Sequence, residues 1–229
     1  MKVTVAAIAG LCLLLIVFGY LLATRDPSGG PRLMPQDSSY AKRLQDQGWE
    51  QGVSSAPLEL VEYGDFQCPT CYAEFSIING ALSQVPTLVR FRYRTYPLTK
   101  IHDKAQLAAL AGEAAGRQGK FWAMHDVLFS RQPSWENDSV GTFRTITLPQ
   151  YARDIQLNVE QFKQDMADAS LEDGVNADVA AGDKVQIVGT PTLLLNGKSL
   201  DPLPITKEEL VADIRQVAAT LPSSSTSKP

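Results

Sequence analysis

Cys68 and Cys71 are the residues of this chain whose type and spacing point most directly to chemistry. They stand three positions apart in the segment FQCPTCYAEF, with Pro69 and Thr70 between them. Such a pair can form a reversible disulfide, supply half of a metal site, or close a structural bridge. The attacking group in disulfide exchange is a thiolate, so a redox role requires a cysteine whose pKa lies below the free value of about 8.5.

A helix that begins at Pro69 provides an environment of this kind. The residues that follow show the three- and four-residue spacing of an amphipathic helix, with apolar side chains at Cys71, Phe75, Ile78, Leu82 and Val85. Proline suits the first helical position, and this places Cys68 at the N-cap. The unpaired N–H groups and the positive end of the helix stabilise an anion there. We therefore predict that Cys68 is the accessible nucleophile and that Cys71, on the buried face, resolves the mixed disulfide.

A metal site or an inert bridge fits the sequence less well. Structural zinc sites take four ligands, commonly from two CxxC pairs or from one CxxC with closely spaced histidines. The two histidines, His102 and His125, are far apart and stand in helical sequence, where we expect packing or capping roles. A disulfide between Cys68 and Cys71 closes a loop too short to constrain the unfolded chain strongly. The sequence favours a redox-active pair and indicates neither a metal nor a cofactor.

The segment before the cysteines alternates as a strand does. Leu58 and Leu60 share one face, with Glu59 and Val61 on the other, and the same period of two puts Glu62 on the face of the two leucines. The pattern leaves two interpretations of this carboxylate. It lies either at an exposed end of the strand or buried beside the cysteines.

The rest of the chain indicates an α/β domain. Residues 88–97 alternate strictly, with three arginines on one face that we expect to be solvated or to lie over a neighbouring helix. Helical patterns dominate from about 101 to 184. A strand then leads into a hairpin at Asn196-Gly197, and a last helix follows that Thr206 and Glu209 cap.

The N-terminal residues predict a membrane anchor. Residues 3–23 contain no charged side chain and would reach roughly 30 Å as a helix, enough to cross a bilayer. We favour an uncleaved anchor over a signal peptide, because Leu21 stands where cleavage requires a small residue. Lys2 before the span places the remaining chain on the extracytoplasmic side of the cytoplasmic membrane, where disulfides persist. Cys12 lies within the span, which leaves Cys68 and Cys71 to pair with each other.

We accordingly divide the chain into four parts: an anchor over 1–24, a linker rich in Pro, Gly and Ser over 25–56, a domain over 57–221, and a tail over 222–229. The net charge of -4 gives no broad basic surface, so we expect no nucleic-acid partner.

These motifs together resemble the DsbA-type thiol-disulfide oxidoreductases, which have a thioredoxin fold with a helical insertion. The matching segments are VEYGDFQCPTC, GKFWAMHDVLF and VGTPTLLLNG, and the resemblance covers about 57–221. It implies that Pro191 is a cis-proline facing the cysteines, and that Thr190 offers its backbone to an extended substrate segment. It also implies that Glu62 is a buried proton acceptor for Cys71.

The resemblance implies an enzyme that passes disulfides to reduced or unfolded secreted proteins and is reoxidised by a quinone-linked membrane partner. Strongly oxidising members of the family carry histidine where this chain has Thr70, which puts the direction of electron flow in question. The Thr70 hydroxyl is either a hydrogen-bond donor to Cys68 or simply exposed. The alternatives are a reductase or isomerase of the same fold, and a substrate-binding module with a static disulfide.

Overall fold

The computed structural model describes residues 48–221. The predicted anchor, most of the predicted linker and the predicted tail lie outside these residues. Over the described part of the chain, no helix is both long and apolar enough to cross a membrane.

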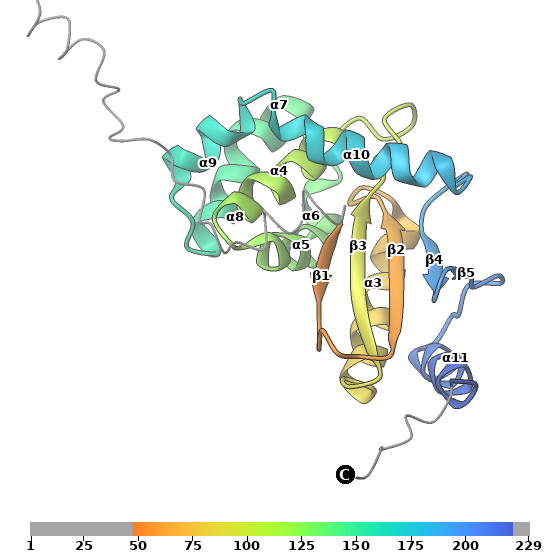
Figure 1. Cartoon of the computed structure of the whole chain (residues 1–229). Coiled ribbons are helices and arrows are strands. Elements are labelled where there is room, and N and C mark those ends of the chain that lie inside the picture. Colours follow the sequence, from red (N-terminus) through yellow and green to blue (C-terminus); the bar gives the residue numbers. More distant parts are fainter. Residues whose placement is uncertain (1–47, 222–229) are drawn as a thin grey trace, which may run out of the picture. The chain divides into compact units, whose positions relative to one another are not determined.

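A five-stranded mixed sheet forms the centre of the domain, in the order β1-β3-β2-β4-β5 (Figure 1). The strands are β1 (Trp49–Gln51), β2 (Leu58–Gly64), β3 (Val89–Thr95), β4 (Thr192–Leu195) and β5 (Lys198–Ser199). β2 and β3 run parallel, as a strand-helix-strand crossover through α3 (Pro69–Gln84) requires, and the other three pairings are antiparallel. The predicted α/β class is confirmed.

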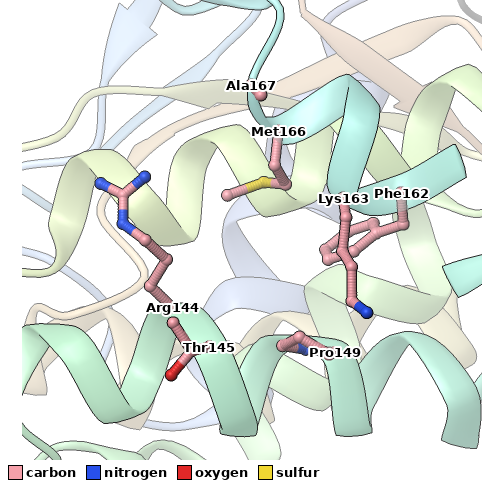
Figure 2. A pocket seen from close by; sticks show the side chains of 7 residues that line it. All are labelled: Arg144, Thr145, Pro149, Phe162, Lys163, Met166 and Ala167. Atoms are coloured by element: carbon pink, nitrogen blue, oxygen red, sulfur yellow. The ribbon is translucent and has the colours of Figure 1, made fainter. Parts of the chain in front are cut away.

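The chain between β3 and β4 is helical, as predicted. Its elements are α4 (Ala105–Arg117), α5 (Phe121–Ser130), α6 (Gln132–Trp135), α7 (Val140–Thr142), the π-helix η1 (Phe143–Thr147), α8 (Leu148–Asp154), α9 (Val159–Met166) and α10 (Leu171–Lys184). A pocket of about 330 Å³ opens between η1, α8 and α9, and Figure 2 shows Arg144 and Lys163 beside apolar side chains that include Phe162 and Met166.

One face of the sheet carries the core that supports the cysteines. In the parallel register Phe91 of β3 pairs with Leu60 of β2 and Tyr93 pairs with Glu62, and the rings of Phe66 and Tyr93 are 5.1 Å apart. Helix α3 covers this face together with α11 (Lys207–Ala219), which packs along it. The predicted caps are present, since the Thr206 side chain accepts from the Glu209 N–H.

The predicted linker ends earlier than we expected, and residues 49–56 belong to the domain. Strand β1 pairs with β3, Trp49 is only 2% exposed, and its indole N–H donates to Glu113 at 3.0 Å. The Trp49 ring also stacks on Phe121 at 4.3 Å. A strand of three residues is too short to show a hydrophobic period. Its pairing partner β3 also lies 40 residues further along the chain, so the sequence of residues 49–51 did not reveal the strand.

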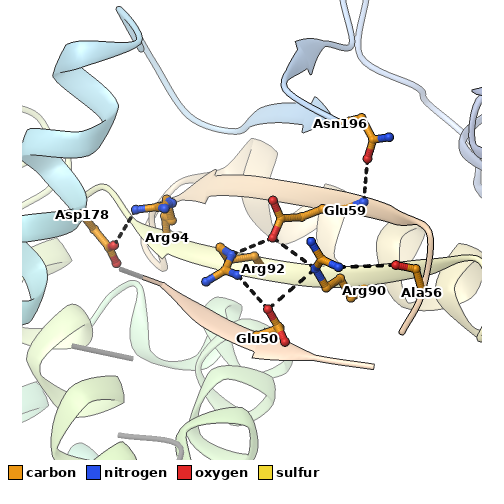
Figure 3. A network of polar contacts seen from close by, with 8 residues as sticks. All are labelled: Glu50, Ala56, Glu59, Arg90, Arg92, Arg94, Asp178 and Asn196. Atoms are coloured by element: carbon orange, nitrogen blue, oxygen red, sulfur yellow. Dashed lines mark hydrogen bonds and ion pairs between the residues drawn. The ribbon is translucent and has the colours of Figure 1, made fainter. Parts of the chain in front are cut away.

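The opposite face carries the three arginines of β3, and they are ion-paired rather than solvated (Figure 3). Arg92 donates to Glu50 at 2.7 Å and to Glu59 at 2.9 Å, and Arg94 lies 3.4 Å from the buried Asp178 of α10. The acids come from three other elements, β1, β2 and α10. This network links the helical insertion to the sheet. The guanidinium groups that an anionic partner would need are already paired with acids of the chain.

Candidate active site

The two cysteines lie at the start of α3, as the sequence predicted. Helix α3 begins at Pro69, and Cys68 is its N-cap residue with extended backbone angles of φ -71° and ψ 124°. Both thiols are free. Cys71 is completely buried and Cys68 is 6% exposed, whereas Pro69 and Thr70 are exposed at the surface.

The environment of Cys68 favours its thiolate. A hydrogen bond from the Cys71 thiol lowers the pKa of Cys68 to about 5; burial opposes this shift, and the backbone N–H groups of Cys71 and Thr70 add to it. Thr70 thus acts through its backbone, while its side chain is exposed.

Cys71 has the opposite character. Burial raises the pKa of Cys71 well above its ordinary value, and the hydrogen bond that it gives to Cys68 and the nearby charge of Glu62 raise it further. The backbone N–H of Asp65 donates to the Cys71 sulfur at 3.5 Å. At neutral pH one sulfur is therefore an anion and the other a thiol.

This asymmetry predicts how the reduced protein reacts with iodoacetamide. Because the pKa of Cys68 is lowered to about 5, its thiolate is present above that pH and is lost as the pH falls through it. We expect one cysteine to react, with a rate that is half-maximal near pH 5 and flat above about pH 6.5. Mass spectrometry after short reaction times measures both the rate and the site. A midpoint near 8.5, as for a free thiol, would contradict the prediction; Cys68→Ser serves as the control and should leave only slow modification at alkaline pH.

The segment before β4 faces the cysteines from the other side. The Thr190-Pro191 peptide bond is cis, as the resemblance implied, and the Thr190 carbonyl lies 3.3 Å from the Cys68 sulfur, where it accepts a hydrogen bond from the thiol form of Cys68. Val188, two residues before Thr190, is 98% exposed. The structure thus brings Thr190, which precedes Pro191 in sequence, to Cys68 across 122 residues of sequence.

Glu62 is buried, which decides between the two interpretations of the strand pattern. It is 2% exposed, and burial raises its pKa well above the ordinary value, with the charges of Glu74 and Cys68 adding to the effect. Glu74 of α3 is buried as well, and burial raises its pKa to about 7.

Sequence reasoning did not identify two residues that shape the site. Asp65 accepts hydrogen bonds from Gln67 N–H at 2.8 Å and from Leu98 N–H at 2.9 Å, and its carboxylate lies 2.7 Å from Nδ1 of His102. An aspartate just after a strand is a known turn former, so this signal was available. Gln132 of α6 left no comparable signal. Its side-chain amide donates to the carbonyls of Phe66 and Cys68, at 2.8 and 3.1 Å.

His125 and the pocket of Figure 2 do not form a rival redox site. His125 is buried among aromatic rings, and burial lowers its pKa. Within residues 48–221, no group of three or more His, Cys, Asp or Glu side chains is arranged to hold a metal ion. The residues that line the pocket of Figure 2 include neither a thiol nor a carboxylate. The cysteine pair is the candidate redox centre.

Comparison with known proteins agrees with this geometry. The family model Thioredoxin_4, described as thioredoxin, matches residues 45–215. The solved structure of oxidised BdbD from Bacillus subtilis is 26% identical, with a TM-score of 0.65 over 76% of this chain and 94% of that one. MdbA from Corynebacterium diphtheriae, a thiol-disulfide oxidoreductase, is 17% identical, with a TM-score of 0.61 over 75% of this chain and 91% of that one. The predicted resemblance to DsbA-type proteins, with a helical insertion in a thioredoxin-like fold, is confirmed.

A curated relative is a much longer protein. The Na(+)/H(+) antiporter NhaA 1 of Salinispora arenicola (strain CNS-205) is 37% identical over 153 residues, which are 67% of this chain and 22% of the antiporter. The chain thus matches about a fifth of that relative's length.

Proposed function

The chain belongs to the thioredoxin family, and we propose that it is a protein thiol-disulfide oxidoreductase that donates the Cys68–Cys71 disulfide to substrate proteins. The observation that carries the proposal is the difference between the two sulfurs. Cys68, at the helix start, has a pKa lowered to about 5, while Cys71 is buried with a raised pKa. A pair of this kind has one sulfur that reacts with substrate and one that stays within the protein.

The exchange proceeds in two attacks. A substrate thiolate attacks the Cys68 sulfur of the disulfide form, the Cys68–Cys71 bond breaks, and Cys71 takes the electron pair. The second substrate thiolate then attacks the substrate sulfur of the mixed disulfide, so the substrate is oxidised and Cys68 leaves as a thiolate. The low pKa makes Cys68 a good leaving group in this second step.

Cys71 needs a proton when it leaves, because its buried thiolate is unfavourable. Glu62 is suited to supply it, since burial keeps its carboxyl protonated to a higher pH than usual. We assign Glu62 this role, and the reverse one when Cys71 attacks.

Thr190 and Pro191 are suited to hold the substrate segment beside Cys68. The Thr190 carbonyl lies 3.3 Å from the Cys68 sulfur, and backbone groups at a strand start can pair with an extended peptide. The exposed Val188 adds apolar surface for a side chain of that peptide.

The low pKa of Cys68 predicts the reduction potential of the cysteine pair, and that potential tests the proposed direction of electron flow. A low pKa stabilises the reduced pair and so makes the disulfide a stronger oxidant. The value of about 5 for Cys68 lies between about 7 for thioredoxin and about 3.5 for DsbA, so we expect a potential between about -270 and -120 mV. Equilibration in glutathione buffers followed by trapping of free thiols measures it. A value at or below about -270 mV would favour the reductase alternative.

We further propose that the domain acts outside the cytoplasm on reduced or unfolded secreted proteins, anchored through residues 3–23. A quinone-linked membrane partner would then accept the two electrons and restore the disulfide. The apolar N-terminal sequence supports the location, and the free low-pKa thiol of Cys68 supports exchange with a partner.

A further inference from the structure

Tyr93 carries a buried hydroxyl that folding does not explain. The residue lies in β3 and is fully buried, and within residues 48–221 its hydroxyl has no hydrogen-bond partner. Phenylalanine would fill the same space without burying an unsatisfied polar group. Oε1 of Glu62 is likewise buried without a partner in this part of the chain.

The two unsatisfied oxygens lie close together. Glu62 and Tyr93 are directly paired in the parallel register of β2 and β3, so their side chains stand side by side on one face. A Cβ atom at Gly64 would lie 2.8 Å from the Tyr93 hydroxyl, 2.9 Å from Oε1 of Glu62 and 2.5 Å from a ring carbon of Tyr93. Both oxygens therefore border the space that a side chain at Gly64 would fill. They are close enough for a hydrogen bond to form between them, either directly after a small movement or through one water.

The surroundings of the hydroxyl belong to the redox centre. Burial raises the pKa of Tyr93 well above its ordinary value, and the ionised forms of Glu62 and Cys71 raise it further. The Tyr93 ring lies 4.8 Å from the His125 ring. The titratable groups that face Glu62 or Tyr93 from the elements packed around them are Asp65 after β2, Cys68, Cys71 and Glu74 of α3, His125 of α5, and Asp178 of α10. The acids in this set are like-charged with an ionised Glu62, so they disfavour its carboxylate.

We propose that Tyr93 is a positioning residue whose hydroxyl donates a hydrogen bond to the Glu62 carboxylate in the state where Glu62 has given its proton to Cys71. The inference rests on the proposed function and adds a residue to it. When the Cys68–Cys71 bond breaks, Cys71 takes the electron pair and then the proton of Glu62, which leaves a carboxylate whose charged neighbours, among the groups named above from residues 48–221, are acids. The neutral hydroxyl of Tyr93 offers the donor that this carboxylate requires.

Tyr93→Phe tests this inference on the full chain. The measurement is the rate at which the disulfide form reacts with a reduced dithiol peptide, across pH. Loss of one hydrogen bond to a charged group should slow the neutral-pH rate by about tenfold to a hundredfold. It should also move the midpoint of the pH profile upward, because Glu62 then holds its proton more tightly. The pH profile of Cys68 alkylation should not change.

Tyr63→Phe is the matched control, since Tyr63 is next to Glu62 in β2 but belongs to a separate cluster with Val61 and Ile187. It should leave the rate and the pH profile unchanged. The carbonyl band of the protonated Glu62 carboxyl in infrared difference spectra, identified by its loss in Glu62→Gln, gives a readout independent of activity. Its titration should shift upward in Tyr93→Phe.

The outcomes separate the two proposals. A wild-type protein that does not oxidise the peptide overturns the proposed function, whereas an active wild type with a Tyr93→Phe variant of the same rate, pH profile and infrared titration overturns the role of Tyr93. If Tyr93→Phe does not fold, Gly64→Ala keeps the hydroxyl but displaces the ring, and the same infrared titration decides.

Discussion

Replacing Cys68 with serine is expected to abolish oxidation of a reduced model protein, to the uncatalysed background. A serine hydroxyl cannot form the mixed disulfide, and Cys71 cannot replace Cys68 because it is fully buried and its pKa is raised. The assay is the gain of activity of a reduced, unfolded substrate protein, followed with catalytic amounts of the chain. Retention of more than a few per cent of the wild-type rate would show that the chemistry lies elsewhere.

Cys71→Ser provides the matched comparison. Cys68 remains in place with its helix-start environment, so this variant should still react with a substrate disulfide but should not resolve the product. A stable mixed disulfide through Cys68, seen as a shift on a non-reducing gel and removed by reductant, is the expected result. A non-enzymatic binding module with a static bridge would instead keep its function in both variants.

Replacing Asp178 with alanine is expected to lower the free energy of unfolding by about 3 kcal/mol. The carboxylate is fully buried in α10, where it lies 3.4 Å from Arg94 and accepts the backbone N–H of Thr95 at 3.1 Å. Its removal leaves a largely buried guanidinium and a buried N–H without this acceptor. Urea unfolding followed by circular dichroism measures the change in the free energy of unfolding.

Asp173→Ala is the control for this experiment, because Asp173 lies in the same helix but is exposed. We expect it to cost less than about 1 kcal/mol, as an exposed acid in a first helical turn does. If the Asp178 variant were no less stable than the Asp173 variant, the ion pair between α10 and β3 would not contribute to the fold.

The sequence revealed those features that depend on local spacing. The helix start at Pro69, the strands β2 and β3, the turn at Asn196-Gly197 and the cap at Thr206 all follow from patterns a few residues long, and each is present. The strand period put Glu62 on the face of Leu58 and Leu60 but left its burial open, and only the family resemblance implied that the carboxyl is buried.

Features that depend on contacts between distant segments were not predictable in this way. The acids that neutralise Arg92 come from β1 and β2, and no pattern within β3 specifies them. Because β1 has only three residues, its sequence shows no hydrophobic period, and the burial of Trp49 could not be predicted from it. Gln132 meets the cysteine loop only because α6 folds back onto it, across 64 residues of sequence. The position of Thr190 opposite Cys68 came from family resemblance, since its own sequence indicates only the start of a strand.

The contact of Gln132 bears on how such a domain can be passed from one protein to another. Two carbonyls of the loop that presents Cys68 find their donor in the inserted helices, and the insertion is also tied to the sheet through Asp178. A shortened copy that kept the sheet and α3 but lost residues 105–184 would lose the Gln132 donor that holds these two carbonyls and would open the cysteine loop to water. We therefore expect gene fusion to transfer the sheet and the helical insertion together, with fusion boundaries outside both.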